Sequence, residues 1–322
     1  MNLRSLLCGL IALMLAACGD GAGKSSGRTR ISVQLNWVPE PEFGGLYAAQ
    51  QDGLFRDAGL DVEIIRSTGG TAVPQLVAQG VCDVGIVSGD QILTLREQGG
   101  DLVAVFNVFD GSPYGFMVHA AGAPPTLEAM WKGTGKVACE SGLPVIRFIE
   151  ATYGPSTRQV VPWGGNLAAF QGDPAMAAQC FITAEPVQMD LAKVPVKVLS
   201  LAEAGYDPYT VVMAVKPGRL SAEALRAFVA ANQEGWKRYL ADPAKYNPGI
   251  AALNPAMSLE AMNLAADRMK PLLLTPWTRE HGLGSMDPAR WKAMSDTLQR
   301  LGVLKRAHEP AEVMAWPGPD AS

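Results

Sequence analysis

The segment ISVQLNWVPEPEFGGLYAA, residues 31–49, passes from a strand pattern through a loop into a helix pattern. Residues 31–35 are mostly β-branched or apolar, which is typical of a buried strand. Pro39 and Pro41 then interrupt regular structure, because proline has no backbone donor. Good helix formers follow at 46–51. A strand, a loop and a helix in this order predict one unit of an α/β protein.

The same alternation continues through the first two-thirds of the chain. Strands are predicted at 31–35, 62–65, 84–87, 102–108, 116–118, 136–139, 159–161, 180–183, 197–199 and 210–215. Helices are predicted at 46–51, 73–79, 91–98, 127–132, 144–153 and 167–171, and later at 221–240, 243–253, 258–270 and 287–301. Alternation predicts parallel sheets with helices on their faces.

Ten strands are too many for one small sheet, so we expect two sheets and two lobes. The chain is expected to leave the first lobe near His119 and to return near Tyr206. Lobe 1 would comprise residues 31–118 and 207–322, and lobe 2 residues 119–206. Two crossings predict a hinge of two strands.

Residues 35–49 closely resemble the opening of the NMT1/THI5-like family, the pyrimidine-precursor-binding branch of the ABC-transporter solute-binding proteins. Further matches follow in order, at 51–55, 59–62, 80–85, 182–186 and 236–243. The resemblance implies the type II periplasmic-binding-protein fold, an α/β fold with the ligand held between two lobes. It also implies a small-molecule ligand and, as partners, the permease and ATPase subunits of an importer.

Asn36 and Trp37 come directly after a predicted strand, where open α/β sheets place their ligand crevices. Trp37 precedes a proline-rich loop and has few ways to be buried, so we expect it to stack on a ligand. The alternative is a Trp that fills a gap between loop and helix. By resemblance, Glu185 accepts hydrogen bonds from a ligand N–H group; a solvated loop Glu is its alternative.

Several loop residues complete the predicted ligand site. Hydroxyl and backbone N–H groups at 67–70 and 88–90 lie between a strand and a helix, although ordinary helix capping explains them equally. Tyrosines and a second Trp add aromatic groups on neighbouring loops. The predicted site is Asn36, Trp37, Tyr47, Thr68, Gly69, Ser88, Asp90, Tyr114, Trp163, Glu185 and Tyr209.

The N-terminus has the pattern of a bacterial lipoprotein. Residues 6–17 form an apolar run after Arg4, too short to cross a bilayer but typical of a signal peptide. Leu15-Ala16-Ala17-Cys18 resembles a lipobox. We therefore expect a signal peptide at 1–17, lipidation of Cys18, a flexible tether at 18–30 and a location on the periplasmic side of a bacterial membrane. A plain secretory peptide is the alternative.

Composition excludes several function classes. A net charge of −4 without a basic run argues against nucleic acid as a partner. Three histidines and no CxxC motif predict no metal site and no cofactor. Cys139 and Cys180 would pair only if their strands were neighbours; otherwise they are buried small residues. We expect a monomer.

The same fold serves a eukaryotic pyrimidine synthase, which carries a cysteine cluster and a pocket histidine. Here Phe43 stands where related sequences often place His, and no cysteine cluster occurs. We therefore expect a binding protein and no enzyme. Its predicted ligand is a planar N-heterocycle, such as a thiamine-pyrimidine precursor or a riboflavin-like compound. A sulfonate or amine ligand, and a sensor-linked binding protein, are the alternatives. The cleft loops carry Glu and Asp but no Arg, which favours a cationic or neutral ligand.

Overall fold

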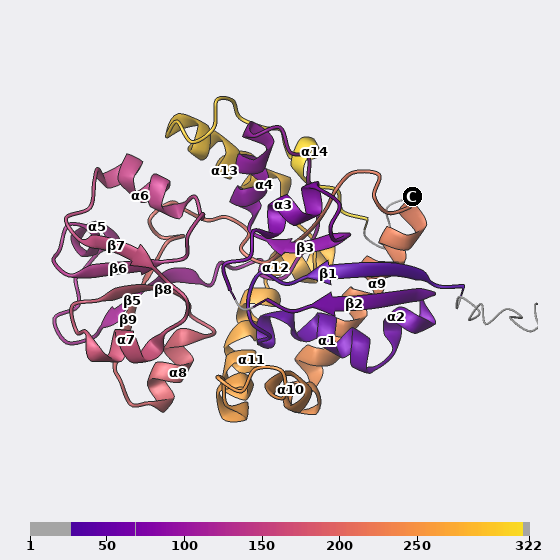
Figure 1. Ribbon diagram of the computed structural model, residues 1–322, viewed down its shortest axis with the longest axis horizontal. Helices are drawn as coiled ribbons and strands as arrows, with labels where there is room; N and C mark the ends of the chain where they lie inside the picture. The colour runs from indigo at the N-terminus through magenta and orange to yellow at the C-terminus, as the bar shows by residue number, and fades with distance from the viewer. Residues whose placement is uncertain (1–26, 68, 318–322) are drawn as a thin grey trace, which may run out of the picture.

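The computed structural model describes residues 27–67 and 69–317. The predicted signal peptide, Cys18, most of the predicted tether and Thr68 lie outside these residues. Figure 1 shows two α/β lobes side by side, each built around its own sheet. In the part of the chain that is described, no helix combines the length and the apolar character needed to cross a bilayer.

Lobe 1 contains a five-stranded sheet of order β2-β1-β3-β10-β4. Strand β1 pairs in parallel with β2 and β3, and β10 runs antiparallel between β3 and β4. The strands are β1 (Thr29–Gln34), β2 (Leu60–Ile65), β3 (Val84–Val87), β4 (Val103–Asn107) and β10 (Val212–Val215).

Lobe 2 repeats this order with β7-β6-β8-β5-β9. Strand β6 is parallel to β7 and β8, and β5 runs antiparallel between β8 and β9. The strands are β5 (Tyr114–His119), β6 (Lys136–Cys139), β7 (Gln159–Pro162), β8 (Ala177–Phe181) and β9 (Val196–Ser200). The two-lobed type II periplasmic-binding-protein fold expected from the sequence is therefore the observed one.

The predicted lobe boundary is wrong at β5. Residues 116–118 were expected in lobe 1, but Gly115 pairs with Cys180 and Ser200 in the second sheet. The chain therefore crosses between β4 and β5, before Tyr114, and returns between β9 and β10. Residues 116–118 are buried, as expected of a central strand in either sheet. The sequence of this run therefore does not indicate its lobe, which is determined by the strands it pairs with.

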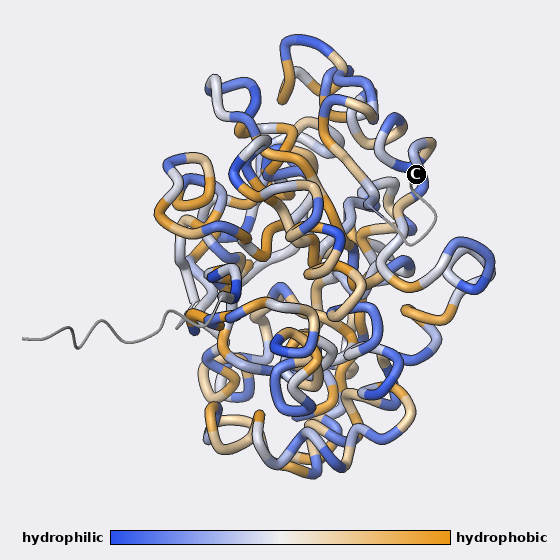
Figure 2. Tube along the Cα trace, turned by 90° about the vertical axis from the view of Figure 1, so that its right-hand side faces the viewer, coloured by the Kyte–Doolittle hydropathy of each residue, from blue (hydrophilic) through white to orange (hydrophobic). Residues whose placement is uncertain are grey.

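Helices cover both faces of each sheet. Lobe 1 carries η1 (Pro41–Phe43), α1 (Gly44–Gln51), α2 (Leu54–Asp57), α3 (Val73–Ala78), α4 (Gly89–Glu97), α9 (Ala222–Ala241), α10 (Pro243–Ala251), α11 (Leu259–Leu273), α12 (Pro276–His281), α13 (Pro288–Arg300) and α14 (Pro310–Val313). Lobe 2 carries α5 (Leu127–Trp131), α6 (Val145–Tyr153), α7 (Leu167–Gly172) and α8 (Glu185–Leu191). Figure 2 shows the apolar segments of the trace running mainly through the interior.

The helices of the last third begin at side-chain caps. Ser221, Asp242, Ser258 and Asp287 each accept a hydrogen bond from a backbone N–H in the first turn. Pro243 and Pro288 follow two of these caps as the first helical residues, a position where the missing backbone N–H of proline costs nothing.

Helices α1 and α9 approach each other closely on one face of sheet 1. A Cβ placed at Gly235 would overlap the carbonyl oxygen of Gly45, and one at Gly45 would overlap the Trp236 ring. Glycine at both positions therefore permits the helix contact that holds α1 in place.

Cys82, Cys139 and Cys180 are free and buried. Cys139 and Cys180 lie on neighbouring strands but belong to different apolar clusters. The two side chains thus lie on different faces of the sheet, and they act as small buried residues.

Candidate ligand-binding site

A cavity lies between the lobes at the carboxyl ends of β1, β6, β7 and β8. It encloses about 420 Å³ of empty space, including its mouth. In open α/β sheets, ligands bind at this edge. The lining residues are Asn36, Trp37, Glu40, Glu42, Glu140, Trp163, Gln179, Cys180, Phe181, Ala184 and Glu185.

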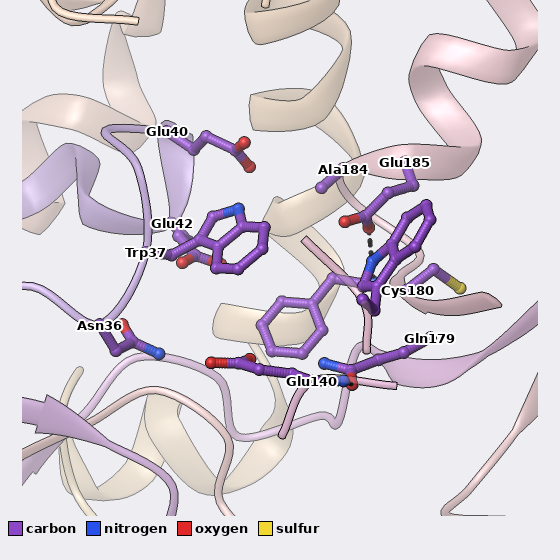
Figure 3. Close-up of a pocket in the computed structure, with 11 residues that line it drawn as sticks. Asn36, Trp37, Glu40, Glu42, Glu140, Gln179, Cys180, Ala184 and Glu185 are labelled. Carbon is purple, nitrogen blue, oxygen red and sulfur yellow. Dashed lines mark hydrogen bonds between the residues drawn. The ribbon is translucent and has the colours of Figure 1, made fainter. Parts of the chain in front are cut away.

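Trp37 touches glycines from both lobes. A Cβ placed at Gly69 of lobe 1 would lie 3.0 Å from its ring, and one placed at Gly165 of lobe 2 would lie 3.2 Å away. Both glycines have positive φ, at 92° and 74°. The ring therefore fits between two backbone turns that only glycine adopts easily. One of its faces remains toward the cavity (Figure 3).

The loop that carries Trp37 continues into two buried carboxylates. Glu40 and Glu42 are only 7% and 6% exposed. Pro39 and Pro41 restrict this loop, and the Asn254 amide donates to the Pro39 carbonyl oxygen at 3.0 Å. The neighbouring Phe43 is buried in the core of lobe 1. These contacts fix the loop with both carboxylates at the cavity (Figure 3).

Lobe 2 contributes two further carboxylates. Glu140 follows β6, and its backbone N–H donates to Oε1 of Gln179 at 2.8 Å. Glu185 begins α8, and the Phe181 backbone N–H donates to its Oε2 at 3.0 Å. The Trp163 indole donates to the same carboxylate, as the dashed line in Figure 3 shows. Glu185 is thus held by two donors.

Burial and mutual repulsion raise the pKa values of these acids. Desolvation is the largest cause for Glu40 and Glu42, followed by the charges of neighbouring carboxylates. Desolvation also raises the pKa of Glu140, and it raises that of Glu185 to about 7 despite the two donors. Near neutral pH the unliganded cavity therefore keeps part of its acids protonated.

A second cavity adjoins the first and shares four of its lining residues, Asn36, Glu140, Gln179 and Phe181. Ser88, Asp90, Tyr114 and Thr210 also line it. The hydroxyl oxygens of Tyr114 and Thr210 and Oδ1 of Asn36 are buried, and no described residue hydrogen-bonds them. These atoms are available to a ligand's polar groups.

Ser88 and Asp90 also have structural partners. Gln91 accepts from the Ser88 backbone N–H at 2.9 Å, in the manner of a helix cap. The Ser88 and Tyr206 hydroxyls both donate to the Asp90 carboxylate, which is buried. The capping alternative therefore explains part of this predicted group.

The structure brings most of the predicted residues to the two cavities but not all. Tyr47 is buried in the core of lobe 1, and Tyr209 packs against Trp291 and accepts from the Asp287 backbone N–H at 2.7 Å. Neither is among the residues that line these two cavities. Gly69 acts through its contact with Trp37, and Thr68 lies outside the described residues.

Sequence reasoning missed Glu40, Glu42, Glu140, Gln179 and Phe181 as lining residues. For the first two a signal was present: two acids flank Pro41 in a loop that begins with Trp37. Gln179 carries no comparable signal, because a polar residue inside a strand is ordinary.

Known proteins resemble this chain in sequence and in fold. The NMT1/THI5-like family model matches residues 40–246. The 4-amino-5-hydroxymethyl-2-methylpyrimidine phosphate synthase THI11 of Saccharomyces cerevisiae is 26% identical over 145 residues, 44% of this chain and 42% of that protein. A formylaminopyrimidine-binding protein of Halalkalibacterium halodurans is 30% identical over 100 residues, 31% of this chain and 30% of that protein.

The chain thus spans less than half of the length of these curated relatives. Among solved structures, the periplasmic aliphatic sulphonate-binding protein SsuA of Escherichia coli has a TM-score of 0.64 at 14% identity. The match covers 91% of this chain and 93% of that chain, so the two share a fold. Because the family model covers more than half of its residues, the chain belongs to the NMT1/THI5-like family.

Proposed function

We propose that this protein is the extracytoplasmic solute-binding subunit of an ABC importer. It captures a small planar N-heterocycle, a thiamine-pyrimidine precursor or a riboflavin-like compound, in the cavity between its lobes. One observation carries the proposal: a single cavity is lined by Trp37 from lobe 1 and by Trp163 and Glu185 from lobe 2. A planar ligand with N–H donors satisfies both the rings and the carboxylate.

The transport cycle follows from the two-lobed architecture. Ligand contacts from both lobes exist together only when the lobes are closed, so the ligand favours the closed form. The closed form is then delivered to the permease and reopens there. Trp37 couples binding to closure, since its ring lies against Gly165 of lobe 2.

We propose binding without catalysis. Among the described lining residues of the two cavities there is no histidine. The one lining thiol, Cys180, is buried, and burial raises its pKa well above the usual value, which opposes formation of a reactive thiolate. Some relatives are named as synthases, so the proposal needs a direct test. After incubation with the protein, candidate pyrimidines should be recovered chemically unchanged.

The proposed location is the periplasmic side of a bacterial membrane, with a lipid anchor on Cys18. The lipobox-like run at 15–18 and the fold shared with the periplasmic protein SsuA support it. Mass spectrometry of the protein from a bacterial membrane fraction tests the anchor. An N-terminal residue other than acylated Cys18 would contradict it.

A thermal-shift screen of residues 18–322 tests the binding proposal. The panel contains pyrimidines, flavins, sulfonates and amines. A ligand at a hundredfold excess over its Kd stabilises the folded state by about 2.7 kcal/mol. We expect a shift with a planar N-heterocycle that is lost in Trp37→Ala. A shift that Trp37→Ala leaves unchanged would move the binding site elsewhere.

A further inference from the structure

We infer that the ligand of this cleft is a planar cation with N–H donors at two of its edges, held between carboxylates from both lobes. This inference rests on the proposed binding function and narrows its ligand class. The cation meets Glu40 and Glu42 on the lobe 1 side and Glu140 and Glu185 on the lobe 2 side.

The charge of the cavity is of one sign. Loops of both lobes bring the four glutamates to one cavity, and Asp90 lines the adjoining one. None of the described lining residues of either cavity is Lys, Arg or His. The other titratable groups there are Cys180 and Tyr114. An anionic ligand would find no opposite charge here.

The carboxylates of lobe 1 lack the partners that a structural role would supply. Glu42 is 6% exposed and receives no hydrogen bond from any described residue. For Glu40, the Trp37 side chain is the one neighbour that lowers the raised pKa. Elsewhere in lobe 1 the carboxylate of Asp52 contacts Arg238, Lys245 and Tyr246. A buried carboxylate without a partner is costly, and a cationic ligand removes this cost.

The aromatic groups define the shape of the cation. Trp37, Trp163 and Phe181 line the same cavity as the acids. Ring faces attract both planar groups and cations. Glu40 and Glu42 lie on the Trp37 side of the cavity and Glu185 lies on the other side (Figure 3), so donors are needed at two edges of the ligand. Amidinium and aminopyrimidinium groups meet these requirements.

Binding of such a cation should release protons. Burial keeps Glu40 and Glu42 partly protonated in the unliganded protein, because their pKa values are raised. The incoming positive charge favours the ionised acids and lowers those pKa values. Affinity should therefore rise with pH until the ligand itself loses its proton.

Three probes of nearly equal shape test the charge: benzamidine, benzamide and benzoate, which are cationic, neutral and anionic at pH 8. Calorimetric titration should show benzamidine binding at least about tenfold more tightly than benzamide, since hydrogen bonds to charged groups are the stronger ones. Titration in two buffers of different ionisation enthalpy should show proton release.

Glu42→Gln should remove most of the preference for benzamidine over benzamide. The exposed Glu280→Gln is the matched control and should leave the preference unchanged. Equal or tighter binding of benzamide to the unaltered protein would overturn the inference. Benzamide binding that is lost in Trp37→Ala would then leave the proposed binding function intact.

A measurement without ligand decides the inference if no probe binds. Glu42→Gln removes the buried charge, so it should raise the melting temperature at pH 8 more than at pH 5. That result would show that the Glu42 carboxylate is buried without a compensating positive charge, as the inference requires. An unchanged melting temperature at pH 8 would show that Glu42 is already compensated, and the inference fails.

Discussion

The two lobes have the same strand order but hold their cleft loops differently. In lobe 1, residues 39–43 after β1 are all buried, and Asn254 binds the loop from the distant α10–α11 connection. In lobe 2, the equivalent loop after β6 exposes Ser141 and Gly142, and the edge strand β7 is largely exposed. Lobe 1 therefore provides a fixed platform for the ligand, whereas the lobe 2 loops have fewer buried contacts.

This difference suggests a division of work during binding. A platform that is already in place loses little freedom when the ligand arrives. Exposed loops with few buried contacts open more easily. We therefore expect lobe 1 to bind first and lobe 2 to close over the ligand, and substitutions in the two lobes should differ accordingly.

The largest expected effect concerns the helix contact beneath the platform. Gly235→Ala should destabilise the protein by about 3 kcal/mol, because the new Cβ meets the backbone of Gly45. Gly172→Ala at the end of α7 in lobe 2 is the control; a Cβ there meets nothing within 4 Å, so we expect a gain of about 0.5 kcal/mol. Urea unfolding of both variants measures the difference. A similar loss of unfolding free energy in both variants would contradict the proposed difference in packing between the lobes.

The second expected effect separates the two tryptophans. Trp37→Ala should weaken ligand binding by about 2 kcal/mol and reduce closure, because Trp37 contacts both lobes. Trp163→Ala should weaken binding less and also release Glu185 from one donor. Calorimetry gives the affinities, and small-angle scattering with and without ligand gives the closure. Normal compaction in Trp37→Ala would show that another contact couples binding to closure.

The third expected effect is a pH dependence located in lobe 2. The pKa of Glu185 is raised to about 7, so the folded protein holds a proton that the unfolded chain loses near pH 4.5. Stability of the unliganded protein should therefore fall between about pH 4.5 and 7 and then level off, by less than the ~3 kcal/mol of a shift this large, because Glu185 is only partly buried.

Glu185→Gln should flatten this part of the stability profile. Glu150→Gln on α6 is the matched control, because Glu150 is exposed in the same lobe. Melting temperatures at half-unit pH steps measure both profiles. If the slope survives in Glu185→Gln, the other buried acids of the cavity, Glu40, Glu42 and Glu140, are its source.

The smallest expected effect concerns an ion pair across the lobes. Arg268 on α11 of lobe 1 donates to Asp190 on α8 of lobe 2, and both side chains are substantially exposed. Arg268→Ala should weaken ligand binding by at most about 0.5 kcal/mol, and the difference should vanish in high salt. Affinities in low and high salt measure it. A loss that persists in high salt would point to packing of the Arg stem instead.

Much of the fold was predictable because each strand has a recognisable pattern in its own local sequence. Each of the ten predicted strands overlaps an observed strand. Strand β8 begins earlier than expected, at Ala177, because two alanines carry little strand signal. The lobe of β5 was not predictable, since the partners that fix it, β8 and β9, come much later in the chain.

The site was predictable only where one strand end determines it. Asn36 and Trp37 come just after β1, which ends at Gln34, and both line the cavity. Glu40 and Glu42 were not predicted as buried, because acids in a loop are usually solvated and their burial depends on contacts such as that of Asn254. Tyr47 was misplaced because the rotation of α1 about its own axis decides whether that side chain meets the core or the cleft.

The insertion of β10 into sheet 1 has a consequence for how the chain folds as it is made. Sheet 2 is formed from one continuous stretch, Tyr114 to Ser200, and it can close as soon as that stretch has emerged. Sheet 1 cannot, because β3 and β4 are joined only through β10, which is synthesised after the whole of lobe 2. The platform is therefore the later half to be completed, and its strand edges stay open until then.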